Sequence, residues 1–402
     1  MSKKRVLMVA LDYPPCKSAG VQRTVKFIEF LTGLGWECAV LTGMPHMYEE
    51  ISDMPVPSVR RVYRAFGLNT FKHLSVRGKH FSFSVKPDRF FTWYWHGVIV
   101  GKKALDEFKP DLIWSTFPCS TAHKIANKLS EKSGLPWVAD YRDPFAGVNP
   151  EVNVTNEPGK RIDNLTIEKA SKVVFSTKNC LDIYREYYSD CDEGKFSVIT
   201  NGYNEEQFSE VEKNIKPGAN HEGFTLLHSG ALYPGGRDPR ELIYAVFELK
   251  KRNVVNSDFR LLFRGCKREY ELQELIEKLD LQASVCFLES IPYDESIEEM
   301  LTVDGLFLLQ GKMFNNQIPG KAYEYLRSGK PILALVHKEG STADLMSPFD
   351  GVYVADMNSK DEIVEQLSKM LIEHPKCIDR DIGQYSREST AKKLAHVFDS
   401  LR

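Results

Sequence analysis

The sequence lacks the cysteine patterns of secreted and zinc-binding proteins. Its 8 cysteines are scattered over 402 residues, with no Cys-x-x-Cys pair and no His/Cys cluster at zinc-ligand spacing. It also has no apolar run near the roughly 18 residues that a membrane span needs. The basic N-terminus leads into only six apolar residues before Asp12, which predicts a strand and not a signal peptide. We therefore expect a cytoplasmic protein with reduced, mostly buried thiols.

Net charge is almost absent as well, because 53 Lys and Arg stand against 55 Asp and Glu. A near-neutral chain gives bulk nucleic-acid binding no electrostatic support, so we expect no nucleic-acid partner. No Gly-x-Gly-x-x-Gly follows the first predicted strand, which argues against a dinucleotide-dependent dehydrogenase.

The length is too great for one hydrophobic core and predicts two domains of roughly 200 residues each. Apolar residues make up 42% and charged residues 27%, as in soluble globular proteins. Apolar runs of strand length alternate with amphipathic helical segments in both halves, which indicates two Rossmann-like α/β domains. We place the first domain at 1–202, a polar linker at 203–223, the second domain at 224–384 and a final helix at 385–402.

The most informative stretch is 312–336, in which a polar loop, a short helix and an apolar strand follow one another. Free backbone N–H groups at a helix start favour anions, and Lys321 adds a positive charge there. Glu324, one helical turn on, can accept two hydrogen bonds from a diol. Phosphates and a ribose would suit this pair, and an ordinary i,i+3 surface ion pair would also fit the spacing.

Two further segments place polar groups at the ends of predicted strands, where α/β proteins keep their chemistry. The strand that starts at Phe224 ends in a Gly-rich loop from Gly230 to Arg237, which describes an anion site at a helix start. The strand 136–140 ends in Asp140-Tyr141-Arg142-Asp143-Pro144, and a salt-bridged loop that fixes the proline is the alternative interpretation there.

These segments resemble GT-B glycosyltransferases of family 4, and the similarity runs through nearly the whole chain. The string PWVADYRDP resembles the family segment that lines the acceptor side, and Thr200-Asn201-Gly202 resembles the turn that closes the first domain. The loop from Gly230 resembles the "G.l.p.KG" diphosphate loop. The stretch 312–336 resembles the segment with two glutamates before a "GkP" strand.

The resemblance implies two Rossmann-like domains that face each other across a cleft, with the C-terminal helix packing back on the first domain. Glu324 matches the glutamate that holds the donor ribose, whereas Asn316 stands at the position of the other glutamate. Arg237 would meet the donor diphosphate. Ala231 stands where many members have Arg, and Lys312 is a candidate replacement.

The remaining assignments follow the same resemblance. Donor binding is assigned to Gly20, Asn201, Gly230, Arg237, Ile291, Lys312, Asn316, Lys321 and Glu324. Catalysis is assigned to Asp143, Arg142 and Asp140, with Asp143 polarising the acceptor hydroxyl and Arg142 as a phosphate or orientation contact. Arg23 would face the cleft on the acceptor side.

The implied function is transfer of a sugar from a nucleotide-diphosphate sugar to the hydroxyl of a lipid-linked or surface-polysaccharide intermediate. Retention of configuration is implied, without a cofactor or metal, because helix ends and cationic side chains stabilise the leaving diphosphate. No Asp-x-Asp motif serves the donor. Three alternatives stay open: a GT-B nucleotide-sugar 2-epimerase, an inactive nucleotide-binding partner of another transferase, and a synthase that uses a soluble sugar acceptor.

Residues 58–109 are a compositional anomaly, with eleven Lys and Arg against three Asp and Glu and nine Phe, Trp or Tyr residues from Phe66 to Trp95. Basic residues mixed with aromatic ones suit an anionic lipid surface or a phosphate-bearing lipid acceptor. Peripheral contact with the inner face of the membrane is one hypothesis. A solvated loop beside a core aromatic cluster is the other.

Overall fold

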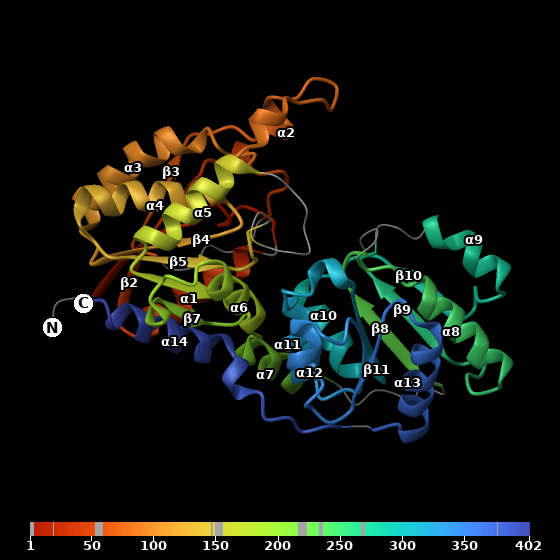
Figure 1. The fold of residues 1–402 in the computed structure, drawn as a ribbon. Coiled ribbons are helices and arrows are strands. Elements are labelled where there is room, and N and C mark those ends of the chain that lie inside the picture. Colours follow the sequence, from red (N-terminus) through yellow and green to blue (C-terminus); the bar gives the residue numbers. More distant parts are fainter. Residues whose placement is uncertain are drawn as a thin grey trace. The chain divides into compact units, whose positions relative to one another are not determined.

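The computed structural model describes residues 4–18, 20–52, 59–145, 148, 156–215, 223–232, 236–266, 270–375 and 377–402. The chain divides into two compact units, of which the first comprises Met1–Asn201 with Arg387–Arg402 and the second Gly202–Ser386. Each unit has helices on both faces of a parallel sheet (Figure 1). The predicted fold class, with two Rossmann-like α/β domains, is confirmed.

The first unit contains a 7-stranded sheet with the order β3-β2-β1-β4-β5-β6-β7. Its strands are β1 (Lys4–Val9), β2 (Trp36–Gly43), β3 (Arg61–Ala65), β4 (Leu112–Thr116), β5 (Trp137–Tyr141), β6 (Lys172–Phe175) and β7 (Phe196–Val198). Its helices are α1 (Val21–Gly33), α2 (Thr70–His73), α3 (Trp93–Phe108), α4 (Ser120–Ser133), α5 (Glu157–Lys169), α6 (Lys178–Tyr187) and α14 (Arg387–Asp399). Figure 1 shows α3, α4 and α5 above the sheet and α1 and α14 below it.

The second unit contains a 6-stranded sheet with the order β10-β9-β8-β11-β12-β13. Its strands are β8 (Thr225–Ser229), β9 (Arg260–Arg264), β10 (Val285–Leu288), β11 (Gly305–Gln310), β12 (Ile332–Val336) and β13 (Val352–Ala355). Its helices are α7 (Glu205–Asn214), α8 (Arg240–Lys251), α9 (Tyr270–Lys278), α10 (Tyr293–Thr302), α11 (Gly320–Arg327), α12 (Ser341–Met346) and α13 (Lys360–Glu373).

Strands β11 and β12 are buried at every position and almost entirely apolar, because both faces of the sheet are covered. In β11, Phe307 and Leu309 pack in one core with side chains of α8 and α13, whereas Leu306 and Leu308 pack in a second core with α10 and α11. The two cores lie on opposite faces, because successive strand residues point to opposite sides. Figure 1 shows the two helical layers with the sheet between them.

The segment expected as a linker, 203–223, differs from that expectation in its first half. Glu205–Asn214 forms α7, which belongs to the second unit. The helix buries the fully enclosed Phe208, and the Arg327 guanidinium lies 5.3 Å from that ring while it forms ion pairs with two glutamates of the helix. The sequence analysis missed this helix because its residues are mostly acidic or polar, and only Phe208, Val211 and the paired charges hold it against the unit. Residues 216–222 lie outside the described residues.

The C-terminal helix α14 belongs to the first unit. Phe398 packs edge-on against Trp36 at 5.2 Å between ring centroids, and Lys4 Nζ lies 2.6 Å from the Asp399 carboxylate. Across the described ranges, no helix combines the length and hydropathy that crossing a bilayer requires.

Candidate functional site

Each sheet has a point where the strand order reverses direction, and this is where open α/β sheets bind ligands at the carboxyl ends of their strands. In the first unit β1 lies between β2 and β4, and in the second unit β8 lies between β9 and β11. The residues expected to form the site divide between these two places.

In the first unit, Arg23 and Asp140 form a buried bidentate ion pair. Arg23 Nη2 donates to Asp140 Oδ1 at 2.6 Å and Arg23 Nε donates to Oδ2 at 3.0 Å. The residues are 4% and 0% exposed, and the Thr116 hydroxyl donates to the same carboxylate at 2.8 Å. The attraction within a buried ion pair offsets the free-energy cost of removing both charges from water only when their remaining donors and acceptors are also hydrogen-bonded. The Arg23–Asp140 pair meets this condition.

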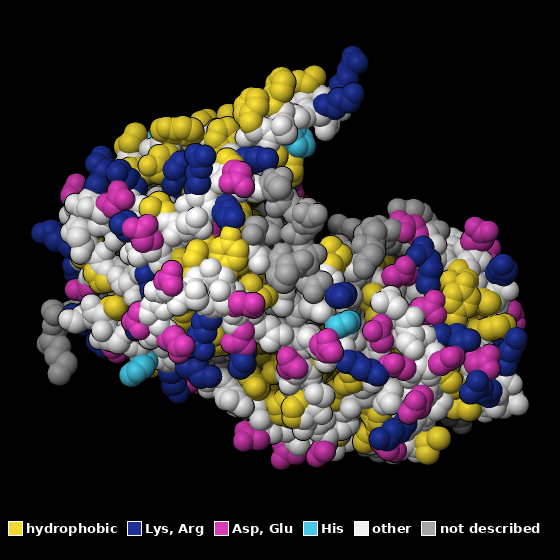
Figure 2. Space-filling view, viewed as in Figure 1, with side chains coloured by type: hydrophobic (Ala, Val, Ile, Leu, Met, Phe, Trp, Pro, Cys, Tyr) yellow, Lys and Arg dark blue, Asp and Glu magenta, His cyan; other side chains and the backbone are white. Residues whose placement is uncertain are grey.

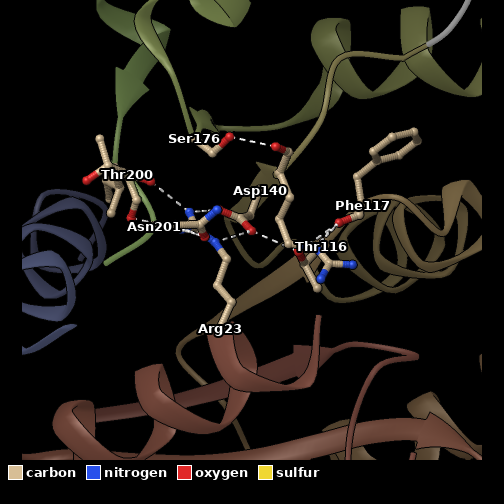
Figure 3. Close-up of polar contacts among 9 residues, drawn as sticks. Arg23, Thr116, Phe117, Asp140, Ser176, Thr200 and Asn201 are labelled. Carbon is tan, nitrogen blue, oxygen red and sulfur yellow. Dashed lines mark hydrogen bonds and ion pairs between the residues drawn. The ribbon is translucent and has the colours of Figure 1, made fainter. Parts of the chain in front are cut away.

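The remaining donors of Arg23 are also used within the first unit. Nη2 donates to the Ile199 carbonyl at 2.9 Å, and Nη1 donates to the Thr200 carbonyl at 3.0 Å and to Asn201 Oδ1 at 3.2 Å. Figure 3 shows Arg23 reaching between Asp140 and the segment with Thr200 and Asn201. The Arg23–Asp140 pair therefore connects α1 and β5 to the segment 199–201, which follows β7.

This arrangement differs from the expected roles of three residues. Arg23 was expected to face the cleft, yet its side chain is buried and hydrogen-bonded on all sides. Asp140 was expected to take part in catalysis, yet it is fully buried, and Asn201 spends its side-chain oxygen on Arg23. The sequence did not reveal this ion pair, because a charged residue after a predicted strand indicates where the side chain lies but not which residue it pairs with.

Arg142 holds a second ion pair at the same edge of the sheet. Its Nη2 donates to Asp12 Oδ2 at 2.7 Å and its Nε donates to the Phe117 carbonyl at 2.6 Å. A Cβ atom built on Gly20 would lie 1.8 Å from Arg142 Nη1 and 2.1 Å from Asp12 Oδ2. Glycine is therefore required at position 20 by this ion pair.

Asp143 lies next to these charges without joining them. It is half-buried, and among the described residues no hydrogen bond or ion pair reaches its carboxylate. Burial raises the pKa of Asp143, and the Arg142 and Arg23 charges oppose that rise. A partly exposed carboxylate that lies after β5 and pairs with none of the described side chains is a candidate contact for a ligand hydroxyl.

In the second unit, Lys321 points from α11 to the end of β8. Its Nζ donates to the Ser229 carbonyl at 2.5 Å and lies 3.4 Å from His228 Nε2. Gly230 has φ +127, and a Cβ there would lie 2.5 Å from the Lys321 ammonium. Glycine is needed at 230 both for its backbone conformation and for this close approach.

The surroundings of Lys321 disfavour its charge. Burial lowers the pKa of Lys321 to about 7, and the nearby Arg237 adds to the effect while Glu324 opposes it. Burial and the Lys321 charge also lower the pKa of His228 well below its usual value, so His228 is neutral. Two basic side chains, Lys321 and Arg237, thus lie close enough at the end of β8 for the charge of Arg237 to disfavour the charged form of Lys321.

Arg237 and Glu324 belong to the same site. Arg237 Nη1 donates to the Ala231 carbonyl at 3.4 Å, and its guanidinium lies 5.8 Å from the Phe314 ring. The Tyr293 hydroxyl donates to Glu324 Oε1 at 2.5 Å. Residues 233–235 of the Gly-rich loop lie outside the described residues.

The first amides of α11 have no side-chain cap. Pro319 precedes the helix, and a Cβ built on Gly320 would meet nothing within 4 Å. Space is therefore open beside Gly320, and the Ala322 amide donates to the Pro319 carbonyl at 3.0 Å. The amides of Gly320 and Lys321 are the candidates for binding an anion at this helix start.

The other donor-side residues differ in their surroundings. Ile291 is half-buried and lies two residues before Tyr293, which contacts Glu324. Asn316 is 9% exposed within the loop that leads to α11. Lys312 is exposed, and no contact of its ammonium is found in the described part of the chain, so its role as a replacement for an arginine at position 231 stays a prediction.

Sequence reasoning missed several residues that shape the site. Asp12 served in the sequence analysis only to mark the end of the first apolar run, although an acid three residues after the last residue of β1 could have suggested a site contact. Gln310, the last residue of β11, holds the loop before α11, because its side-chain nitrogen donates to the Phe314 carbonyl at 2.7 Å and the Gln317 carbonyl at 2.9 Å. No sequence signal identifies Tyr293 as the partner of Glu324.

Groups of three or more His, Cys, Asp or Glu side chains that could hold a metal are not found in the parts of the chain that the structure describes. The expectation that no metal takes part remains a prediction.

Comparison with known proteins identifies the architecture. Sucrose-phosphate synthase from Thermosynechococcus elongatus is 13% identical, with a TM-score of 0.74 over 99% of this chain and 99% of that chain. The structure of Anabaena HepE in complex with UDP and glucose is 15% identical, with a TM-score of 0.66 over 99% and 100%. The chain has the GT-B fold.

A third GT-B structure and a family model extend the comparison. WaaG, described as a glycosyltransferase involved in lipopolysaccharide biosynthesis, is 16% identical, with a TM-score of 0.61 over 98% of this chain and 95% of that chain. Residues 210–389 match the model of the family glycosyl transferases group 1, so the site around Lys321 and Glu324 lies inside the matched region. No curated protein sequence matches the chain.

Proposed function

We propose that this GT-B protein is a glycosyltransferase that moves a sugar from a nucleotide-diphosphate sugar to an acceptor hydroxyl. One observation carries the proposal: a loop glycine, two cationic side chains, a helix start and a carboxylate meet at the β8 end of the second unit. The cations are Arg237 and Lys321, and the carboxylate is Glu324. The match of 210–389 to glycosyl transferases group 1 supports this interpretation.

The chemistry of the site suits departure of a diphosphate. The bond from the sugar C1 to the diphosphate oxygen breaks, and negative charge develops on that oxygen. Arg237, Lys321 and the N–H groups that start α11 stabilise this charge in a preorganised way, without a metal. Glu324 holds the ribose by accepting hydrogen bonds from its diol.

We propose transfer with retention of configuration. The acceptor oxygen forms its bond to C1 on the face that the diphosphate leaves, and the departing diphosphate oxygen takes the acceptor proton. In the first unit, the Asp143 carboxylate orients the acceptor hydroxyl, and the Asp12–Arg142 pair fixes the backbone beside it. We propose a lipid-linked or surface-polysaccharide intermediate as the acceptor, which the likeness to WaaG supports.

Replacing Asp143 by asparagine should reduce transfer about 10- to 100-fold, because a hydrogen bond to a charged group is worth about 1.5–3 kcal/mol. Nucleotide affinity should not change, since the donor contacts lie in the second unit. Initial rates at saturating donor, together with calorimetric nucleotide affinity, check this. A folded variant with full activity would remove Asp143 from the acceptor side.

Donor binding should depend on pH through Lys321. In the free protein the pKa of Lys321 is about 7, so the side chain is charged below that pH and neutral above it. A diphosphate favours the charged form, so affinity should fall as pH rises above 7, by up to about tenfold per pH unit. A nucleotide sugar is the correct probe, because its diphosphate diester does not titrate in this range. Lys321→Met should bind weakly and with a flat pH profile.

A calorimetric screen against UDP-, GDP-, ADP- and dTDP-sugars tests the function itself. We expect one nucleotide to bind clearly, and Glu324→Ala to weaken that binding about 10- to 100-fold, as loss of a charged hydrogen-bond acceptor does. The matched control is Tyr293→Phe, which removes the hydroxyl that donates to Glu324 and leaves the carboxylate in place. Its affinity should stay close to that of the wild type.

Incubating the selected nucleotide sugar with and without acceptors separates two of the three alternatives. A nucleotide sugar that binds and is converted to its epimer without an acceptor would identify an epimerase. Binding without turnover on any acceptor would identify an inactive partner. Equal affinities of the wild type and Glu324→Ala would reject the ribose assignment.

A further inference from the structure

Exposed large apolar side chains are concentrated in one segment of the first unit. Among the described residues, 16 large hydrophobic side chains are exposed, and eight of them lie within 66–99. These eight are Phe66, Phe71, Leu74, Val76, Phe81, Phe83, Trp95 and Ile99, with Val76 76% and Phe81 72% exposed. Scattered exposed apolar residues need no explanation, but a concentration of this kind marks an interaction surface.

The segment that carries these side chains is anchored to the unit by two buried residues. Asn69 and Thr70 are fully buried; Asn69 Nδ2 donates to the Met47 carbonyl at 3.2 Å, and the Thr70 hydroxyl donates to the Ser84 carbonyl. Outside this base, residues 71–83 extend from the unit as α2 and a hairpin, as Figure 1 shows at the top. The exposure is therefore built into the fold.

The tip of the hairpin is a two-residue turn. Val76 and Lys79 exchange backbone hydrogen bonds of 2.8 Å and 3.0 Å, and Arg77 and Gly78 between them have φ of 51 and 75. Two successive positive φ angles give the tight hairpin turn that suits twisted strands. Arg77 and Lys79 therefore lie at the tip of the hairpin, next to the exposed Val76.

The charges on this segment are almost all positive. Residues 66–103 contain seven Lys and Arg and one acidic residue, Asp88. Asp88 is turned inward, since its carboxylate accepts hydrogen bonds from the Thr121 amide at 2.7 Å and the Phe90 amide at 2.8 Å. Figure 2 shows hydrophobic side chains along the upper edge of this unit and Lys or Arg side chains at the tip.

The helix α3 continues the same mixture. Trp95 and Ile99 are 60% and 62% exposed and lie one turn apart on a single face, and the exposed Lys102 and Lys103 follow them. Aromatic rings at headgroup depth with cations beside them are the arrangement by which proteins lie on bilayers.

We propose that the 66–99 surface docks this protein on an anionic lipid bilayer. The exposed rings enter the headgroup region while Arg77, Lys79 and Lys72 pair with lipid phosphates. A second copy of the chain fits less well, because the pairing of like faces would bring the cations together. The inference rests on the proposed function in one respect, since docking brings the enzyme to a lipid-linked acceptor, but it is tested independently.

Vesicle binding tests the docking surface. The probes are phosphatidylcholine vesicles with and without about 30% phosphatidylglycerol, at low and high salt. Tryptophan fluorescence is a specific readout, because Trp36, Trp93, Trp114 and Trp137 are at most 1% exposed and Trp95 is 60% exposed. We expect sedimentation with anionic vesicles only, weakened by salt, and a blue shift in emission that Trp95→Phe abolishes.

Two double variants separate the contributions of the aromatic side chains and of the cations to vesicle binding. Phe81→Ser with Phe83→Ser, and Arg77→Glu with Lys79→Glu, should each weaken binding at least about tenfold, the second because it removes two cations near the lipid surface. The matched control is Ile372→Ser with Lys278→Glu, exposed residues of the second unit, which should bind vesicles like the wild type.

Three results would overturn the proposal: equal binding to neutral vesicles, unchanged binding of both double variants, or a wild-type dimer in sedimentation that the Phe81/Phe83 variant dissociates. The last would identify a second copy as the occupant. Nucleotide affinity should be the same in all variants, so a failed docking surface is distinguishable from a failed donor site.

Discussion

Replacing Asp140 by alanine should lower the free energy of unfolding of the first unit by about 3–5 kcal/mol, the usual cost of removing one partner from a buried ion pair. The loss is large because Arg23 would remain buried without a countercharge, with only backbone carbonyls and Asn201 as partners. The cost of leaving the Arg23 guanidinium buried without a carboxylate contributes more to this loss than the Coulombic attraction that is removed.

Urea unfolding monitored by tryptophan fluorescence measures this loss in the correct unit. All five tryptophans lie at or before position 137, so their emission reports on the first unit alone. The control Asp106→Ala removes an exposed carboxylate from α3 and should leave the midpoint unchanged. The double variant Arg23→Met with Asp140→Leu should lose less than Asp140→Ala. Equal midpoints for wild type and Asp140→Ala would show that the pair does not stabilise the unit.

Replacing Arg237 by alanine should lower the transfer rate about 10²- to 10³-fold, as removal of one preorganised donor to a developing oxyanion does. Its guanidinium is charged at every accessible pH, whereas the pKa of Lys321 lies at about 7. Above neutral pH, Arg237 is therefore the side-chain cation on which the leaving diphosphate depends. Single-turnover rates with saturating nucleotide sugar isolate this step from binding.

The control for this variant is Arg240→Ala, three residues further on. Arg240 is half exposed and pairs with Asp238 at the start of α8, so its removal changes charge by the same amount without touching the site. Its rate should equal that of the wild type. If both variants slow transfer alike, the effect is one of net charge, and the assigned role of Arg237 is wrong.

The sequence was sufficient for the fold because both halves carry unambiguous periodicity. The strand predicted between the N-terminus and Asp12 corresponds to β1. In the second unit, the loop, helix and strand expected in 312–336 appear as the segment before α11, α11 itself and β12. The periodicity of apolar residues predicts such helices and strands, because each of them buries one face or both.

The partners of individual charges could not be predicted from the sequence. Arg142 and Asp12 are 130 positions apart, and Arg23 and Asp140 are 117 apart. Only the order of strands β1, β4 and β5 brings them together. The sequence therefore located Asp140 and Arg23 near the edge of the sheet, but could not show that they neutralise each other while Asp143 stays available.

A crystal structure with the nucleotide sugar that the screen selects tests the central claim most directly. The account predicts the diphosphate at the start of α11, within hydrogen-bond distance of Arg237 and Lys321, with the ribose hydroxyls on Glu324. A nucleotide bound elsewhere, with these three side chains free of ligand, would contradict it.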